Sequence, residues 1–291
     1  INGAEFRTGG GDDHIRVISK HDVHLFGGKG NDKYTMAGAY LTGKESYNAT
    51  IDEMPNEGQD TLDLTGRDHS QYNYYTGALT VEVEYGAERF KVTEWLNSPS
   101  NPGIKTVATA RNVEILKTTI NESHTYKVAD FSWPANGIEW DQKIELGSIA
   151  NAELSLLDFS AVTGKTLTFT LEEHGKVSVT AKDPNNDKTI EWMAYGIKDL
   201  VLAAGTNTIV VTSDRSLAGQ ILSSEVMSGQ ADPRVQNILD YSQLGKGETP
   251  SSKSVRFQNP DVRKYDSITI SQSTLIGLVP MGNYESGAAT G

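Results

Sequence analysis

Apolar and polar residues alternate over short stretches through most of the chain. Between residues 51 and 212, Val81 and Val83 fall on one side of such a stretch and Glu82 on the other. Val177 and Val179 repeat the arrangement. A period of two, with many β-branched residues, is typical of half-buried strands. The pattern predicts an all-β protein with little helix.

The pattern changes after residue 212. Apolar spacing favours two amphipathic helices, over Leu217–Met227 and Asp232–Leu244, the second starting with an Asp-Pro pair suited to a helix N-terminus. Residues 245–254 have the composition of a flexible linker. Strand-like alternation returns over residues 267–279. We therefore expect residues 213–291 to form a small mixed C-terminal segment with one or two helices, a linker and a tail.

The middle of the chain contains a loose duplication. Four strand-like stretches of the first half have counterparts, in the same order, in the second half. The pairs are residues 60–65 with 156–160, 79–86 with 167–175, 112–116 with 197–202, and 124–128 with 207–211. The repetition predicts that residues 51–212 form one duplicated region, either a continued β-solenoid or a β-sandwich.

A short glycine-rich pattern occurs twice near the N-terminus, in residues 8–15 and 27–34. Each copy has a glycine-rich turn, then an aspartate, then an apolar residue two places on. The second copy fits G-G-x-G-x-D-x-U-x at every fixed position, and the first differs only in having Thr8 for the leading glycine. This nonapeptide is the calcium-binding unit of a parallel β-roll.

The residue types of the pattern suit calcium. Glycines let the backbone turn through positive φ, and calcium takes six to eight oxygen ligands from carboxylates and carbonyls. Asp13 and Asp32 are 19 residues apart, close to the repeat of about 18 residues expected for two nine-residue half-turns. Asp22 then falls on the opposite side. The predicted metal-site residues at the shared edge are Asp13, Asp32, Gly9, Gly11, Gly28, Gly30, Asp12 and Asn31.

These two copies resemble the RTX, or hemolysin-type calcium-binding, repeats of secreted bacterial proteins. Residues 51–64 resemble a continuation that often follows such repeats, and their acidic residues are candidates for further cation sites: Asp52, Glu57, Asp60 and Asp63. The resemblance implies a parallel β-roll in residues 1–50, Ca²⁺ as the bound ion, and export by type I secretion. It also implies that the chain is the C-terminal-side region of a large toxin or adhesin.

Composition limits the function further. The chain of 291 residues has 38 Asp and Glu against 26 Lys and Arg, a formal charge of −12, and no cysteine. The acidic charge argues against a nucleic-acid partner, and disulfides are excluded, so that calcium would take over their stabilising role outside the cell. No apolar run approaches the length of about 18 residues that a membrane-spanning helix requires. With repeats at the very start, we expect the chain to be a piece of a longer protein.

No nucleophile, phosphate-binding loop or zinc-protease motif is recognisable, so the sequence predicts a protein without catalytic residues. The favoured function is a calcium-stabilised region of a secreted toxin that supports secretion, extracellular folding and binding to a host cell-surface receptor, a glycan or other domains of the same protein. Two alternatives stay open. One is an accessory region of a secreted protease, lipase or polysaccharide epimerase, and the other is the ligand-binding module of an adhesin.

Overall fold

The structure of the protein is a computed structural model. It describes residues 4–17, 22–36, 48–55, 57–66, 75–85, 88–96, 103–119, 122–133, 143–149, 152–185, 188–212, 217–224, 235–240, 243 and 268–271. Within these ranges the regular structure is nearly all β-strand. The prediction of an all-β protein is confirmed.

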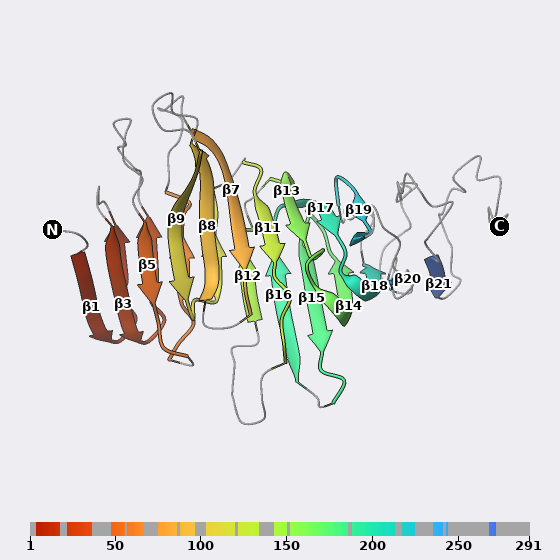
Figure 1. The fold of residues 1–291 in the computed structure, drawn as a ribbon, viewed down its shortest axis with the longest axis horizontal. Helices are drawn as coiled ribbons and strands as arrows, with labels where there is room; N and C mark the ends of the chain where they lie inside the picture. The colour runs from red at the N-terminus through yellow and green to blue at the C-terminus, as the bar shows by residue number, and fades with distance from the viewer. Residues whose placement is uncertain are drawn as a thin grey trace.

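The strands form two large, mostly parallel sheets, called sheet A and sheet B below (Figure 1). In spatial order, sheet A consists of β1 (Ala4–Gly10), β3 (Val23–Lys29), β5 (Ala49–Asp52), β9 (Gly103–Arg111), β8 (Glu88–Leu96), β7 (Tyr75–Val83), β11 (Thr125–Val128), β13 (Ser155–Asp158), β17 (Ile197–Val201) and β19 (Ile221–Leu222). Sheet B consists of β2 (His14–Val17), β4 (Lys33–Met36), β6 (Thr61–Asp63), β10 (Ile115–Lys117), β12 (Lys143–Leu146), β16 (Thr189–Ala194), β15 (Val177–Lys182), β14 (Thr163–Leu171), β18 (Ala204–Val211), β20 (Gln236–Asp240) and β21 (Ile268–Ser271).

From β1 to β6 the chain visits the two sheets in turn. Strands β1, β3 and β5 pair in parallel in sheet A, and β2, β4 and β6 pair in parallel in sheet B. Gly9 pairs with Gly28 in the register of sheet A, and His14 pairs with Lys33 in sheet B. Both registers match the 19-residue spacing of the two glycine-rich copies, so equivalent positions of the copies lie side by side.

Two three-stranded antiparallel segments interrupt this regular alternation. Strands β7, β8 and β9 run antiparallel within sheet A, and β14, β15 and β16 do so within sheet B. Strand β9 returns beside β5, and β16 returns beside β12. The stretches predicted to correspond, β7 with β14, β10 with β17 and β11 with β18, do occur in the same order, but the members of each pair lie in opposite sheets.

The predicted C-terminal helices are wrong where the structure describes them. Strand β20 lies inside the second predicted helix, and β19 lies inside the first. Along β20, Asn237 and Leu239 are buried while their neighbours are not. Asn207 of the adjacent β18 donates a hydrogen bond to the Asn237 side-chain oxygen at 2.8 Å. Pairing with β18 therefore overrides a local apolar spacing that was too short to distinguish helix from strand. The linker and tail lie outside the described residues.

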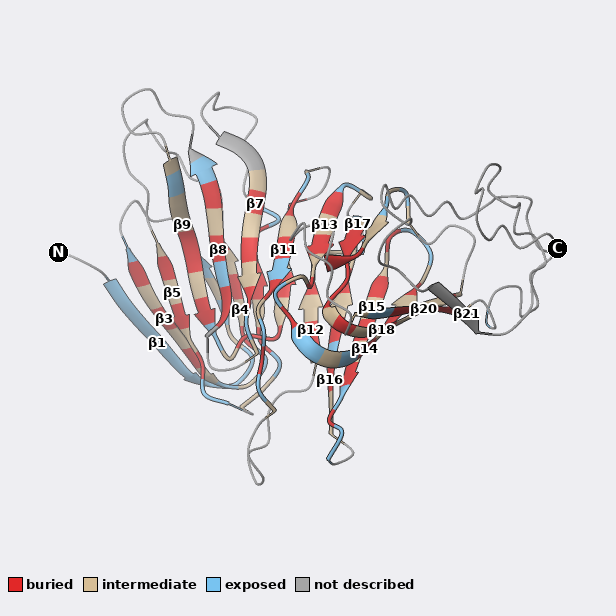
Figure 2. Cartoon of the chain, turned by 45° about the vertical axis from the view of Figure 1, so that its right-hand side comes forward, coloured by how far each residue is buried: buried red, intermediate tan, exposed pale blue. Residues whose placement is uncertain are grey.

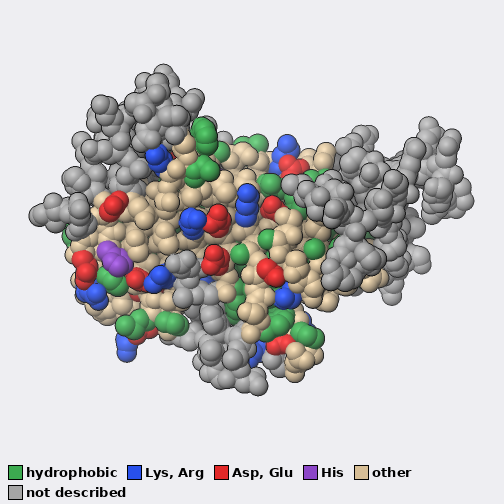
Figure 3. All heavy atoms as spheres, in the orientation of Figure 1, with side chains coloured by type: hydrophobic (Ala, Val, Ile, Leu, Met, Phe, Trp, Pro, Cys, Tyr) green, Lys and Arg blue, Asp and Glu red, His purple; other side chains and the backbone are tan. Residues whose placement is uncertain are grey.

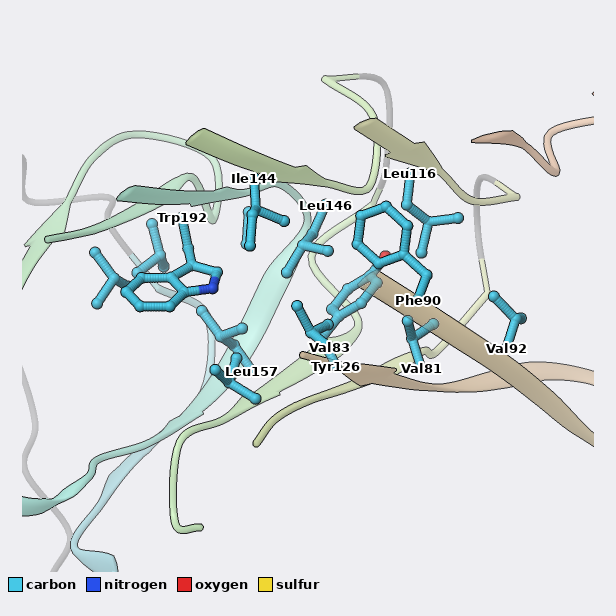
Figure 4. Close-up of a cluster of buried hydrophobic side chains, with 14 of the residues drawn as sticks. Val81, Val83, Phe90, Val92, Leu116, Tyr126, Ile144, Leu146, Leu157 and Trp192 are labelled. Carbon is cyan, nitrogen blue, oxygen red and sulfur yellow. The ribbon is translucent and has the colours of Figure 1, made fainter. Parts of the chain in front are cut away.

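The hydrophobic core lies between the two sheets. Inward-facing side chains are buried at every second position of the central strands (Figure 2). The close-up in Figure 4 shows Trp192 and Ile144 of sheet B facing Leu157 of sheet A. The ring of Phe159 packs edge-on against Trp192, with ring centroids 5.5 Å apart. Because the side chains of the two sheets interdigitate, strands β2 to β6 share one core with the rest of the described chain, whereas β1 is exposed at every position.

His124 is a buried polar residue of this core. It is 0 % exposed; its Nδ1 accepts the Leu79 amide at 3.2 Å, and its Nε2 lies 3.0 Å from the carbonyl oxygen of Thr119. Burial lowers the pKa of His124, and the Thr119 bond opposes this only in part. The neutral ring, with its proton on Nε2, therefore satisfies both partners.

We expect the free energy of unfolding to decrease as the pH falls below about 6.5, because the unfolded chain then binds a proton that folded His124 resists. His124→Gln keeps one acceptor and one donor but does not titrate. Urea unfolding at pH 7.5 and pH 5.5 should show a smaller loss in this variant than in the wild type. Equal losses would show that His124 does not cause the acid sensitivity.

One face of the molecule carries charges of both signs in close proximity, rather than a patch of one sign (Figure 3). On the outer side of sheet A, Lys91 of β8 contacts Glu82 of β7 at 3.1 Å, and Arg111 of β9 lies 3.7 Å from Asp52 of β5. These pairs are partly exposed, so each contributes little to stability. The surface of these strands is therefore mixed in charge despite the acidic composition.

Candidate calcium-binding site

Three turns stack at one edge of the molecule, where the chain crosses from sheet A to sheet B. They are the first turn (residues 8–13, from the end of β1 to the start of β2), the second turn (27–32, from the end of β3 to the start of β4) and the third turn (53–55 and 57–60, between β5 and β6). Strands β1, β3 and β5 lead into them side by side (Figure 1). The first two turns contain all eight predicted metal-site residues.

The four predicted glycines have the backbone conformation that the pattern requires. Gly9, Gly11, Gly28 and Gly30 have φ of 120°, 113°, 92° and 133°. A side chain at Gly28 would put its Cβ 1.9 Å from the carbonyl oxygen of Gly9. At Gly30, the Cβ would lie 2.3 Å from the carbonyl oxygen of Gly11. Positive φ and close stacking of the turns are therefore both reasons for glycine here, and the prediction of φ > 0 is confirmed.

The aspartates form a ladder along this edge. The amide of Asp13 donates to Oδ1 of Asp32, that of Asp32 to Oδ1 of Asp60, and that of Asp60 to Oε2 of Glu114, each at 2.8 Å. Asp13 and Asp32 thus lie at one edge, as their spacing predicts. Asp22 lies at the opposite edge, where its Oδ1 accepts the amide of Asn48 at 2.9 Å.

A second, exposed ladder runs beside the first. The amide of Asn31 donates to Oδ1 of Asp12 at 2.8 Å, and the amide of Gln59 donates to Oδ1 of Asn31 at 2.8 Å. Asp12 and Asn31, predicted as neighbouring ligands, are therefore brought together with the main ladder. Each of these side chains accepts a hydrogen bond from the backbone of the next turn.

Asp32 is the most unusual of the predicted residues. Its side chain is 1 % exposed, and its Oδ2 is buried without a hydrogen-bond partner. A Cβ on Gly27 would lie 2.1 Å from this oxygen and 2.5 Å from the hydroxyl of Tyr34, so all three groups are close together. Burial raises the pKa of Asp32, and the charges of Asp13 and Asp12 add to this effect, while the hydrogen bond from the Asp13 amide opposes it. A bare negative charge here is costly.

Glu53 of the third turn lies beside Asp32, and sequence reasoning missed it. Its carboxylate accepts the amides of Gly27 at 2.6 Å and Gly28 at 3.0 Å, and the Tyr34 hydroxyl also donates to it. It is 5 % exposed. Burial raises its pKa, with a smaller contribution from the charge of Asp32, while the two glycine amides oppose the rise. Leu25 pairs with Ile51, so Glu53 occupies the position that the leading glycine, Gly27, has in the second copy. This correspondence was the signal in the sequence that could have identified Glu53.

The four acidic residues suggested by the continuation of the repeats have different surroundings. Asp60 is buried in the main ladder. Asp63 forms an ion pair with Lys33 at 2.7 Å, and Asp52 lies 3.3 Å from His24. Glu57 contributes its main-chain oxygen to the amide of Gly30 at 3.0 Å. Only Asp60 shares the line of buried carboxylates.

Nowhere in the described ranges do three or more His, Asp or Glu side chains converge as a set of metal ligands. A cation at the turns would therefore take many of its oxygens from the backbone, as glycine-rich turns allow. The residues present fit a hard cation in their donor type, because one buried carboxylate oxygen is unpartnered and carbonyl-rich turns stack beside it. The described part of the chain contains no helix of the length and apolarity needed to cross a bilayer.

Three comparisons were made, with known protein families, with curated proteins and with solved structures, and none gives a match to this chain.

Proposed function

We propose that this chain is a calcium-stabilised, non-catalytic region of a secreted bacterial protein of the RTX type, in which the stacked glycine turns bind Ca²⁺. The favoured setting is a toxin, where the folded region supports secretion, extracellular folding and attachment to a target cell. The two alternatives, an accessory region of a secreted enzyme and an adhesin module, require the same cation chemistry. The fold proposed for the first coils is a parallel β-roll.

One observation carries the proposal: the in-register stacking of two glycine turns around a buried carboxylate whose Oδ2 has no partner. Asp32 is 1 % exposed, and leaving its buried Oδ2 without a hydrogen-bond partner costs about 1–3 kcal/mol. A divalent cation would remove this cost. The alternation of β1 to β6 between two sheets, with a register of 19 residues, supports the β-roll.

The mechanism follows from linkage. Without calcium, the acidic residues of the turns repel one another, and the formal charge of −12 favours expanded states. A cation that binds only the folded turns stabilises them by about 2.7 kcal/mol at a concentration 100 times its dissociation constant. Low calcium would keep the coils unfolded for export, and calcium outside the cell would fold them.

We expect calcium to raise the thermal midpoint of unfolding and to increase strand content in circular dichroism, with a response centred between about 0.1 and 1 mM, the range of extracellular sites. Chelator should reverse the change. Magnesium at equal concentration is the control, because it requires a smaller and more regular site. If several millimolar calcium leaves the thermal midpoint unchanged, the proposed function is overturned.

A further inference from the structure

We infer that Glu53 is a positioning residue for the second turn: it fixes the amides of Gly27 and Gly28, aims the Gly27 carbonyl at the first turn, and makes cation binding there depend on the coil that follows. The inference rests on the proposed function. It adds a residue that the nonapeptide pattern does not contain. It also predicts that the third turn, through Glu53, influences cation binding between the first and second turns.

The geometry of the peptide unit between Gly27 and Gly28 fixes the direction of the Gly27 carbonyl. The Gly28 amide and the Gly27 carbonyl belong to one planar peptide unit, and no cis peptide occurs among the described residues. In a trans unit the N–H and C=O point in opposite directions. Glu53 holds the Gly28 N–H from the side of the third turn at 3.0 Å, so the Gly27 carbonyl must point toward the first turn.

The first turn provides independent evidence for that direction. The Thr8 hydroxyl donates to the carbonyl oxygen of Gly27 at 2.8 Å. Thr8 is also the one position where the first copy departs from the repeat pattern. Glu53 and Thr8 therefore hold the peptide unit between Gly27 and Gly28 from its two sides. That unit faces the interface where the cation is proposed to bind.

Glu53 is itself anchored from further along the chain. Its amide donates to the carbonyl of Arg111 at 3.2 Å, and the Asn112 side chain donates to its main-chain oxygen at 2.5 Å. Asn112 has a φ of 50°, in the left-handed region that asparagine tolerates better than most residues. Arg111 is the last residue of β9 and Asn112 follows it; β9 ends the antiparallel segment β7–β9 and lies beside β5 (Figure 1). The second turn is therefore connected through Glu53 to the end of that segment.

The hydroxyl of Tyr34 completes the arrangement. Tyr34 is 0 % exposed and donates to Glu53 from within the same coil as the second turn. Three donors thus hold one carboxylate. Around metal ions, groups in this outer position orient the ligands, and losing such a group typically lowers metal affinity about 10- to 100-fold. Glu53 needs no cation of its own, because its charge is met by these donors.

The test is a calorimetric calcium titration of the whole chain carrying Glu53→Gln, which keeps the shape but replaces one accepting oxygen with an amide NH2 group that cannot accept from the glycine N–H groups. We expect its calcium dissociation constant to rise about tenfold or more. Glu84→Gln removes the same charge from an exposed position and should stay close to the wild type. Leu157→Ala destabilises the core far from the turns, so it shows how much affinity a loss of stability alone removes.

Two milder variants keep the inference testable if Glu53→Gln does not fold. Tyr34→Phe removes only the hydroxyl, and Asn112→Gly removes the anchoring side chain while accepting the positive φ. Both should weaken calcium binding, and hydrogen exchange should show faster exchange of the Gly27 and Gly28 amides. If the wild type binds calcium and none of these variants binds it more weakly than Leu157→Ala, the role of Glu53 is wrong. If the wild type binds no calcium, the proposed function itself fails.

Discussion

Gly28→Ala is expected to lower the free energy of unfolding by about 2–5 kcal/mol, since two independent costs add. The first is conformational, because Gly28 has a φ of 92°, where an L side chain is strained by about 1–2 kcal/mol. The second is steric, because the new Cβ would lie 1.9 Å from the carbonyl oxygen of Gly9. Backbone atoms supply the contact, so only separation of the first two turns relieves it. Urea unfolding in calcium and in chelator measures the loss.

Gly9→Ala is the matched control. Gly9 pairs with Gly28 across β1 and β3 and has a similarly positive φ of 120°, but a Cβ there would meet no atom within 4 Å. It should therefore lose only the conformational cost of about 1–2 kcal/mol. Equal losses in the two variants would mean that the turns do not stack as closely as the structure has them.

The local parts of the site could be predicted from the sequence. The glycine conformations follow from the repeat itself, because each glycine serves a turn within its own copy. The shared edge of Asp13 and Asp32 follows from their 19-residue spacing once the coil is assumed. A repeated motif fixes its own neighbours, since equal spacing in the sequence becomes equal register in a parallel sheet.

The parts that depend on contacts between different turns could not be predicted. Glu53 meets Gly27 across 26 residues of sequence, from a turn that no longer has the glycine pattern. The exchange of sheets between β7 and β14 is invisible as well, because a half-buried strand has the same alternation in either sheet. The helix predicted over residues 232–244 is wrong at residues 236–240 for the same reason: the partner strand β18 decides the conformation of β20.

The effect of Asp32→Asn on the free energy of unfolding is expected to change sign when calcium is added. In chelator at pH 7.5 the variant should be more stable than the wild type by about 1 kcal/mol, because it removes a buried charge whose Oδ2 has no partner. At calcium 100 times the dissociation constant the wild type should gain about 2.7 kcal/mol, and the variant much less. The order of the two free energies of unfolding should therefore invert.

The difference in free energy of unfolding between the wild type and Asp32→Asn should also depend on pH. Burial raises the pKa of Asp32 in the folded state, so this group favours folding at low pH, and that contribution is lost as the pH rises through the raised value. In chelator, the advantage of Asp32→Asn should therefore shrink as the pH falls from 7.5 toward 4. Asp12→Asn is the control, because Asp12 is exposed and accepts the amide of Asn31, so it should show neither the gain in chelator nor the convergence. A variant at Asp32 that is less stable than the wild type in both calcium and chelator would show that its carboxylate serves the turn without a cation.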